Sequence, residues 1–248
     1  MKFCDEGIII GIKKYGENAA IVKVFSREHG IYRGFARSVK SSKARVIFQI
    51  GNLISFEFHA RLEENLGSFS ACDLARSYCA KFMFDKLKLS CTNSLFSIID
   101  SCFLEREAHE ILFEKLQNFL EEMSDEKKSQ ENFLASYVKL ELEILKQLGY
   151  EIDLSSCVVS GSTSNLAFVS PKSARAVSFE IGKEHENKLL KLPKFLLDEN
   201  AVGSRSCLTE GLKLSGYFLQ KFLFGDDAFI KNQNQLFHRA FLLESLQK

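Results

Sequence analysis

The chain has 248 residues, of which 46% are hydrophobic and 26% charged, the composition of an ordinary soluble protein with enough length for two domains. No apolar run approaches the roughly 18 residues that a membrane helix needs. The opening Met-Lys-Phe-Cys-Asp-Glu is also unlike a signal peptide. We therefore expect a cytoplasmic protein with no membrane partner.

The net charge of +1 hides an uneven distribution of charged residues along the chain. Residues 1–75 hold 11 Lys and Arg against 8 Asp and Glu, whereas residues 76–248 hold 22 against 24. The first part is therefore the basic one. The seven cysteines are scattered and include no Cys-x-x-Cys pair, which indicates reduced and mostly buried thiols in a reducing compartment.

Residues 7–72 alternate between apolar and polar side chains with a period of two, and turn residues interrupt the pattern at short intervals. In the clearest strand, Ile54, Phe56 and Phe58 alternate with polar residues. A loop over 38–43 precedes the segment 46–50. Five short strands in about 75 residues predict a small closed barrel of the OB type, which binds oligonucleotides. We place this OB-fold domain at residues 1–76, with strands over 8–13, 21–25, 31–37, 54–61 and 68–72.

From about residue 75 the apolar residues recur at spacings of three and four, as in helices. We predict helical segments over 77–103, 105–123, 133–148, 209–224 and 235–246, the third ending at Gly149. The last should dock through Leu236, Ala240, Leu243 and Leu246. Residues 153–181 return to short strands. The predicted fold class is thus multidomain α+β, with an OB barrel followed by an all-α domain over 77–248 that carries a small inserted β-hairpin.

The densest positive charge lies in residues 23–45, where seven Lys or Arg accompany a single Glu. Tyr32 and Phe35 lie among these cations, and such a combination can follow a phosphate backbone and stack on unpaired bases. On a strand, Arg33, Phe35 and Arg37 share one face, and Tyr32 lies on the other. The alternatives are a solvated edge strand for the cations and a place in the barrel core for each ring. The predicted DNA-binding residues are Arg27, Tyr32, Arg33, Phe35, Arg37, Lys40, Lys43 and Arg45.

Catalytic and metal-binding patterns are absent from the sequence. The five histidines lack metal-ligand spacing, and no phosphate-binding loop or Gly-x-Ser-x-Gly elbow occurs. We therefore expect a binding protein with no catalytic residues. Two classes stay open on the residues alone: a DNA-binding mediator that anneals strands, and an OB-fold RNA-binding or assembly factor without annealing activity.

Several short motifs, in this order and spacing, resemble the RecO family of recombination mediators and DNA repair proteins. The resemblance covers nearly the whole chain. It implies an OB barrel, a helical domain, binding of single- and double-stranded DNA, and strand annealing. It also implies action in the bacterial cytoplasm at the nucleoid, together with RecR, to load RecA onto strands coated by single-strand binding protein, whose acidic tail the helical domain would receive. The motifs are Asp5-Glu-Gly7, Gly16-Glu17, Arg27-Glu-His-Gly30, Gly34-Phe-Ala-Arg37, Gly51-Asn-Leu53, Leu166-Ala-Phe-Val-Ser-Pro171 and Leu189-Leu-Lys-Leu-Pro193.

Many members of that family carry a four-cysteine zinc ribbon in the helical domain, and the resemblance matches its ligand positions to Cys157, Ser160, Ser178 and Ile181. Zinc requires thiolate or imidazole donors, which only one of these residues supplies. We therefore predict a degenerate ribbon without zinc, no cofactor, and Cys157 as a buried thiol. Apolar burial should then hold the hairpin together, through Val158, Val159, Leu166, Phe168, Val169 and Val177.

Overall fold

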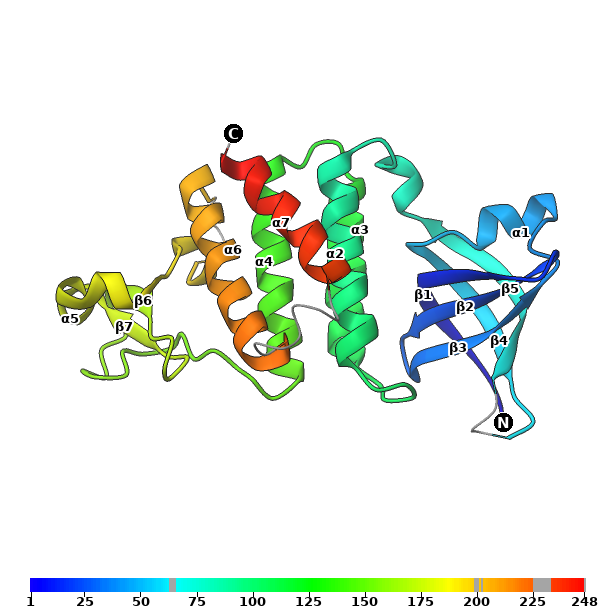
Figure 1. Ribbon diagram of the computed structural model, residues 1–248, viewed down its shortest axis with the longest axis horizontal. Coiled ribbons are helices and arrows are strands. Elements are labelled where there is room, and N and C mark those ends of the chain that lie inside the picture. Colours follow the sequence, from blue (N-terminus) through cyan, green and yellow to red (C-terminus); the bar gives the residue numbers. More distant parts are fainter. Residues whose placement is uncertain (63–65, 199–200, 202, 225–232, 248) are drawn as a thin grey trace. The chain divides into compact units, whose positions relative to one another are not determined.

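The computed structural model describes the chain except for residues 63–65, 199–200, 202, 225–232 and 248 (Figure 1), and the side chains of residues 224, 233–237 and 247. The described residues form two compact units, residues 1–125 and 126–248. No helix among them is long and apolar enough to cross a membrane.

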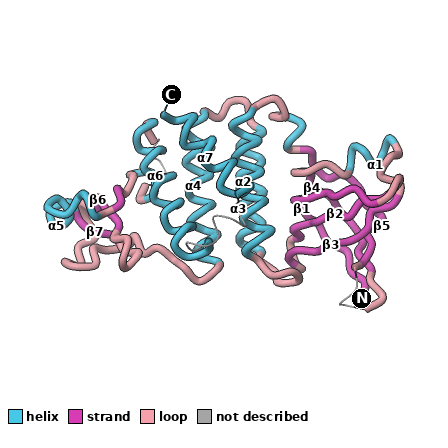
Figure 2. The backbone as a smooth tube through the Cα atoms, viewed as in Figure 1, coloured by secondary structure: helices cyan, strands magenta, loops and turns pink. Residues whose placement is uncertain are grey.

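The first unit begins with a closed five-stranded barrel in the order β1-β2-β3-β5-β4, as predicted (Figures 1 and 2). Neighbouring strands are antiparallel except β3 and β5, which pair in parallel at Gly34 with Gly67 and at Phe35 with Ser68. The parallel pair closes the barrel and leaves no open sheet edge. The strands are β1 (Lys2–Tyr15), β2 (Ala19–Ser26), β3 (Gly30–Arg37), β4 (Asn52–His59) and β5 (Gly67–Ser77).

The barrel core consists of the inward-pointing residues of each strand. Val22 and Val24 on β2 and Phe56 and Phe58 on β4 are almost fully buried. Burial of one such side chain stabilises a fold by about 1.5–3 kcal/mol. Where burial alternates along a strand, as at 20–24 of β2 and 54–58 of β4, the residues between the buried ones form an outer face on which polar and charged side chains are tolerated.

A short helix, α1 (Ser42–Ile47), lies between β3 and β4, where the sequence had indicated a loop and an unassigned segment. The side chain of Ser41 caps it by accepting a hydrogen bond from the N–H of Ala44 at 3.2 Å. At its other end, the Asn52 side-chain amide donates to the carbonyl of Val46 at 2.7 Å. The helix buries Ala44 and Ile47 against the barrel.

Helices α2 (Lys86–Cys102) and α3 (Glu110–Ser124) complete the first unit, after a short 3-10 turn, η1 (Cys79–Lys81). The link between α2 and α3 pairs with the barrel, because the N–H of Arg106 donates to the carbonyl of Ile31 at 3.0 Å. Gly30 has a φ of +78°, and a Cβ there would lie 2.0 Å from the carbonyl oxygen of Glu107. Only glycine fits this contact, so Gly30 allows the link between α2 and α3 to lie directly against the barrel.

The second unit is organised around α4 (Gln130–Gln147), α6 (Arg205–Leu219) and α7 (Gln233–Gln247). The predicted stop of α4 is confirmed, since Gly149 follows it with a φ of +84°. A π-helical turn, η4 (Gln220–Phe224), extends α6. Helix α6 packs against both α4 and α7 (Figure 2).

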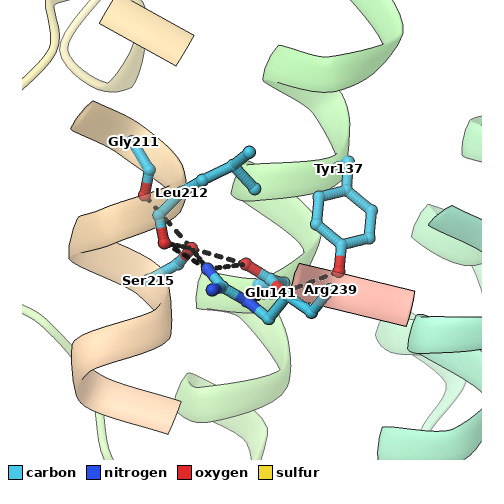
Figure 3. Close-up of polar contacts among 6 residues, drawn as sticks. All are labelled: Tyr137, Glu141, Gly211, Leu212, Ser215 and Arg239. Carbon is cyan, nitrogen blue, oxygen red and sulfur yellow. Dashed lines mark hydrogen bonds and ion pairs between the residues drawn. The ribbon is translucent and has the colours of Figure 1, made fainter. Parts of the chain in front are cut away.

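A buried ion pair joins these three helices (Figure 3). Arg239 on α7 donates from Nε to Glu141 on α4 at 2.9 Å, and Glu141 is fully buried. The carboxylate also accepts hydrogen bonds from Tyr137 at 2.8 Å and from Ser215 on α6 at 2.5 Å. Burial acts to lower the pKa of Arg239, but Glu141 outweighs it and the pKa is raised, so the guanidinium stays charged.

The docking face predicted for α7 is confirmed only at Leu246. Arg239, Leu242 and Leu246 are buried, whereas Ala240 is exposed and Leu243 only half-buried. The side chain of Leu236 lies outside the described residues. Because Arg239 is buried against Glu141, the buried face of α7 differs from the one that its aliphatic residues alone predict.

An insertion between α4 and α6 contains the predicted hairpin, β6 (Leu166–Val169) and β7 (Ala176–Ser178), and a third strand, β8 (Leu190–Lys191), in the order β7-β6-β8. Two short helical turns, α5 (Phe179–Gly182) and η2 (Lys183–Lys188), lie between β7 and β8, and a third, η3 (Lys194–Leu196), follows β8. Phe168, Val169 and Val177 are buried as expected, and Val158 and Leu166 pack against them. Val159 is 67% exposed, so its predicted role in the hairpin core is wrong.

Candidate nucleic-acid interface

The outer face of β3 carries Arg33, Phe35 and Arg37, as the alternation predicted. Both arginines are exposed and Phe35 is half-buried between them. The register places Lys23 of β2 opposite Arg33, and Ala19 opposite Arg37. This part of the barrel therefore presents an aromatic ring between two cations.

Tyr15, at the end of β1, extends this face, and the sequence did not predict it as a site residue. The residue is 56% exposed, and its ring contacts that of Phe35 edge to face, with centroids 5.1 Å apart and planes inclined at 62°. Tyr15 pairs with Ala19 on the intervening strand β2, and the small alanine leaves room for the tyrosine to reach β3. The signal in the sequence was Lys13-Lys14-Tyr15, a basic and aromatic run directly before the turn at Gly16.

Tyr32 occupies the barrel core, the alternative considered for it. Its ring is 6% exposed and makes edge contacts with Phe3 and Phe58, each with centroids 4.9 Å apart. A base cannot reach a ring that is enclosed in this way. Tyr32 and Phe35 thus point to opposite sides of the barrel wall.

Two of the predicted cations have carboxylate partners in or next to helices α2 and α3. Arg27 lies 3.8 Å from Glu114, donates to Gln117 at 3.1 Å, and stacks over the ring of Phe113 at 4.8 Å. Arg33 forms an ion pair with Glu105. Such partly exposed pairs contribute at most about 1 kcal/mol each. Their role is to connect the barrel to the helices of the first unit, in addition to any contact with phosphate.

The remaining cations lie at the end of β3 and on α1. Arg37, Lys40 and Arg45 are exposed, and within the described part of the chain none of them forms an ion pair. Lys43 pairs with Asp73 at 2.8 Å, which raises the pKa of the lysine. Both members of that pair are exposed, so a phosphate could replace the carboxylate. The cations available for an anionic ligand are therefore concentrated around α1.

A hollow of about 450 Å³ lies between α1 and β5. Arg37, Lys43 and His59 bring positive or titratable groups to it, and three serines bring hydroxyls. Burial raises the pKa of Cys72, which also lines it, to about 11, so this thiol is protonated at neutral pH. The lining residues are Arg37, Ser41, Lys43, Ala44, Ile47, Phe48, His59, Ser68, Phe69, Ser70, Ala71 and Cys72.

The insertion of the second unit does not fit a zinc ion. Burial acts to raise the pKa of Cys157, but hydrogen bonds from the Ser160 hydroxyl and from the backbone N–H groups of Ser160, Ser178 and Val159 lower it to about 6. Ser160 thus donates to the sulfur where a second thiolate ligand would stand, and Ile181 has no donor atom. In the described ranges no group of three or more His, Cys, Asp or Glu could hold a metal ion. The absence of zinc from the protein stays a prediction.

Comparison with known proteins covers both units. The family model described as Recombination protein O N terminal matches residues 1–78, and Recombination protein O C terminal matches residues 83–226. The DNA repair protein RecO of Rickettsia bellii strain OSU 85-389 is 40% identical over 225 residues, 90% of this chain and 90% of the relative. Those of Rickettsia typhi and Rickettsia conorii are each 41% identical over 225 residues, 90% of this chain and 92% of the relative. The chain therefore belongs to the RecO family of DNA repair and recombination proteins.

Proposed function

We propose that this protein binds DNA on the outer face of its barrel, anneals complementary strands and, with RecR, helps to load RecA onto strands coated by single-strand binding protein. Membership of a DNA repair and recombination family supports the broad role. The barrel supports the ligand, since OB-folds bind oligonucleotides on the face of strands 2 and 3 and on the adjoining loops.

The observation that carries the proposal is the group of cations around α1. Arg37, Lys40 and Arg45 are exposed on one side of the barrel, beside the Lys43–Asp73 pair, and without an ion pair in the described structure. Phosphates are the ligands that a set of unpaired surface cations attracts, whatever the base sequence.

The test is the salt dependence of DNA binding by the variant R37A/K40A/K43A. If about four cations neutralise phosphates, log affinity for single strands should fall against log salt concentration with a slope of roughly −3. The variant should have a clearly shallower slope and weaker binding to all sequences alike. A matched control, K172A/K183A/K188A, removes three exposed lysines from the insertion of the second unit and should leave the slope unchanged. Wild-type affinity and slope in the first variant would refute the site.

Strand annealing is tested separately from binding. Two complementary oligonucleotides, bare or coated with single-strand binding protein, should pair faster in the presence of the protein. Binding of RNA in preference to DNA, with no acceleration of pairing, would instead favour an OB-fold RNA-binding or assembly factor.

A further inference from the structure

We propose that Tyr15 and Phe35 form a base-stacking platform that selects unpaired bases, so that the barrel prefers single strands to duplex. This inference rests on the proposed DNA binding and adds to it the feature of the ligand that is recognised. Phosphate contacts alone do not distinguish a base from its absence, whereas an exposed ring does.

The two rings come from strands that are not neighbours. Tyr15 is on β1 and Phe35 on β3, and the strand between them presents Ala19 beside Tyr15 and Ile21 beside Phe35. The contact runs edge to face, with centroids 5.1 Å apart. An edge-to-face contact uses at most one face of one ring, and Tyr15 keeps 56% of its surface exposed. Each ring also limits the movement of the other, so less conformational entropy is lost when a base stacks.

The charges around the pair distinguish it from an ordinary exposed aromatic contact, which by itself needs no explanation. Lys13 lies two residues before Tyr15 on the same strand, and Arg33 and Arg37 flank Phe35. The facing segments of the three strands, residues 13–15, 19–23 and 33–37, contain no Asp or Glu. Carboxylates from outside these segments pair with two of the cations, Glu105 with Arg33 and Asp100 with Lys23. Lys13 and Arg37 form no ion pair within the described residues, so a strand of nucleic acid could place a base on the rings and its phosphates beside these two cations.

An exposed ring on the outer wall of the barrel fits an unpaired base better than a duplex. The rings stand on the outer wall of a closed barrel, where a stacked base must be free on at least one face. In a duplex both faces of an internal base are already covered by its neighbours. Stacking therefore adds affinity only for single strands or unpaired ends.

The experiment compares two single-stranded oligonucleotides of equal length and charge, one of thymidines and one abasic, by fluorescence anisotropy at fixed salt with the full chain. The wild type should bind the thymidine strand at least about tenfold more tightly, the effect of one stacked base. Y15L should lose most of this preference while keeping its affinity for the abasic strand and its salt slope. Y15F keeps the ring and should behave as wild type.

A matched control is Y217L in the second unit, because Tyr217 is also exposed and contacts a phenylalanine, Phe218, edge to face at 5.3 Å. It should leave both affinities unchanged. F35L repeats the test from the other ring, and thermal melting identifies any loss of barrel stability. If F35L does not fold, the result for Y15L decides the question, because Tyr15 is exposed and its replacement should not affect folding of the barrel.

Two outcomes separate this inference from the proposed function. If the wild type binds neither oligonucleotide, the proposed DNA binding fails, and the platform with it. If it binds both equally, or if Y15L weakens both to the same extent, DNA binding stands and the stacking platform is overturned.

Discussion

Replacing Arg239 by Met should destabilise the second unit by about 3–5 kcal/mol, because it leaves the carboxylate of Glu141 buried without an opposite charge. The guanidinium donates to both oxygens of that carboxylate, at 2.9 Å and 3.3 Å. The donors that would remain are the hydroxyls of Tyr137 and Ser215, which carry no charge. They cannot compensate for the lost ion pair in a site that excludes water.

Hydrogen exchange resolved by mass spectrometry measures this effect in each unit separately. A loss of 3–5 kcal/mol should accelerate exchange of protected amides in α4 and α6 by roughly 100- to 4000-fold, at about 1.4 kcal/mol for each factor of ten. Amides of β1 to β5 should not change. The matched control is R205M, which removes an exposed hydrogen bond from α6 to the carbonyl of Ser245 on α7 and should have little effect.

A double variant identifies the cause of the instability. E141L/R239M removes both charges, so it should be more stable than R239M although it has lost one more polar group. In that variant Ser215 can still donate to the carbonyl of Gly211 on its own helix, at 3.1 Å. Exchange in α4 and α6 that changes by less than fivefold in R239M, or a double variant less stable than R239M, would refute the reasoning.

Three further predictions concern the residues that follow the barrel. Purified protein should contain no stoichiometric zinc by elemental analysis, and one tightly held zinc per chain would contradict the degenerate ribbon. The folded state favours the charged form of Cys157, so the absorbance of thiolate at 240 nm should increase as the pH is raised through about 6. This increase should be lost in C157A. The stability that this group contributes is present at higher pH and is lost as the pH falls through about 6. A labelled acidic tail peptide of single-strand binding protein should cross-link within residues 77–248 of the full chain, and cross-links confined to the barrel would refute that assignment.

Much of the barrel could be predicted because each strand is long enough to show its alternation. Ile54, Phe56 and Phe58 specify a face without reference to any other strand. Helix α1 could not be predicted in the same way, since a six-residue helix is too short to display a period of 3.6. Its cap at Ser41 is a local signal, but serine is equally common in loops.

The rest of the candidate site depends on contacts between distant parts of the chain. Tyr15 meets Phe35 only because of the register of three strands and the small side chain of Ala19 between them. Likewise, the orientation of α7 depends on Arg239 finding Glu141 on another helix. A periodicity calculated from apolar residues alone treats an arginine as a surface residue and therefore gives the wrong face.

The contact between Gly30 and Glu107 determines where the chain can be cut. A fragment that ends at residue 78, with the matched N-terminal family region, would lack the N–H of Arg106, which donates to the carbonyl of Ile31, and the Phe113 ring that packs on Phe25. Phe25 and Ile31 are almost fully buried in the whole chain and would be open to water in such a fragment. For binding studies or for transfer into another protein, we therefore expect the smallest stable fragment to be residues 1–125, in which the barrel retains the helical segments that pack on it.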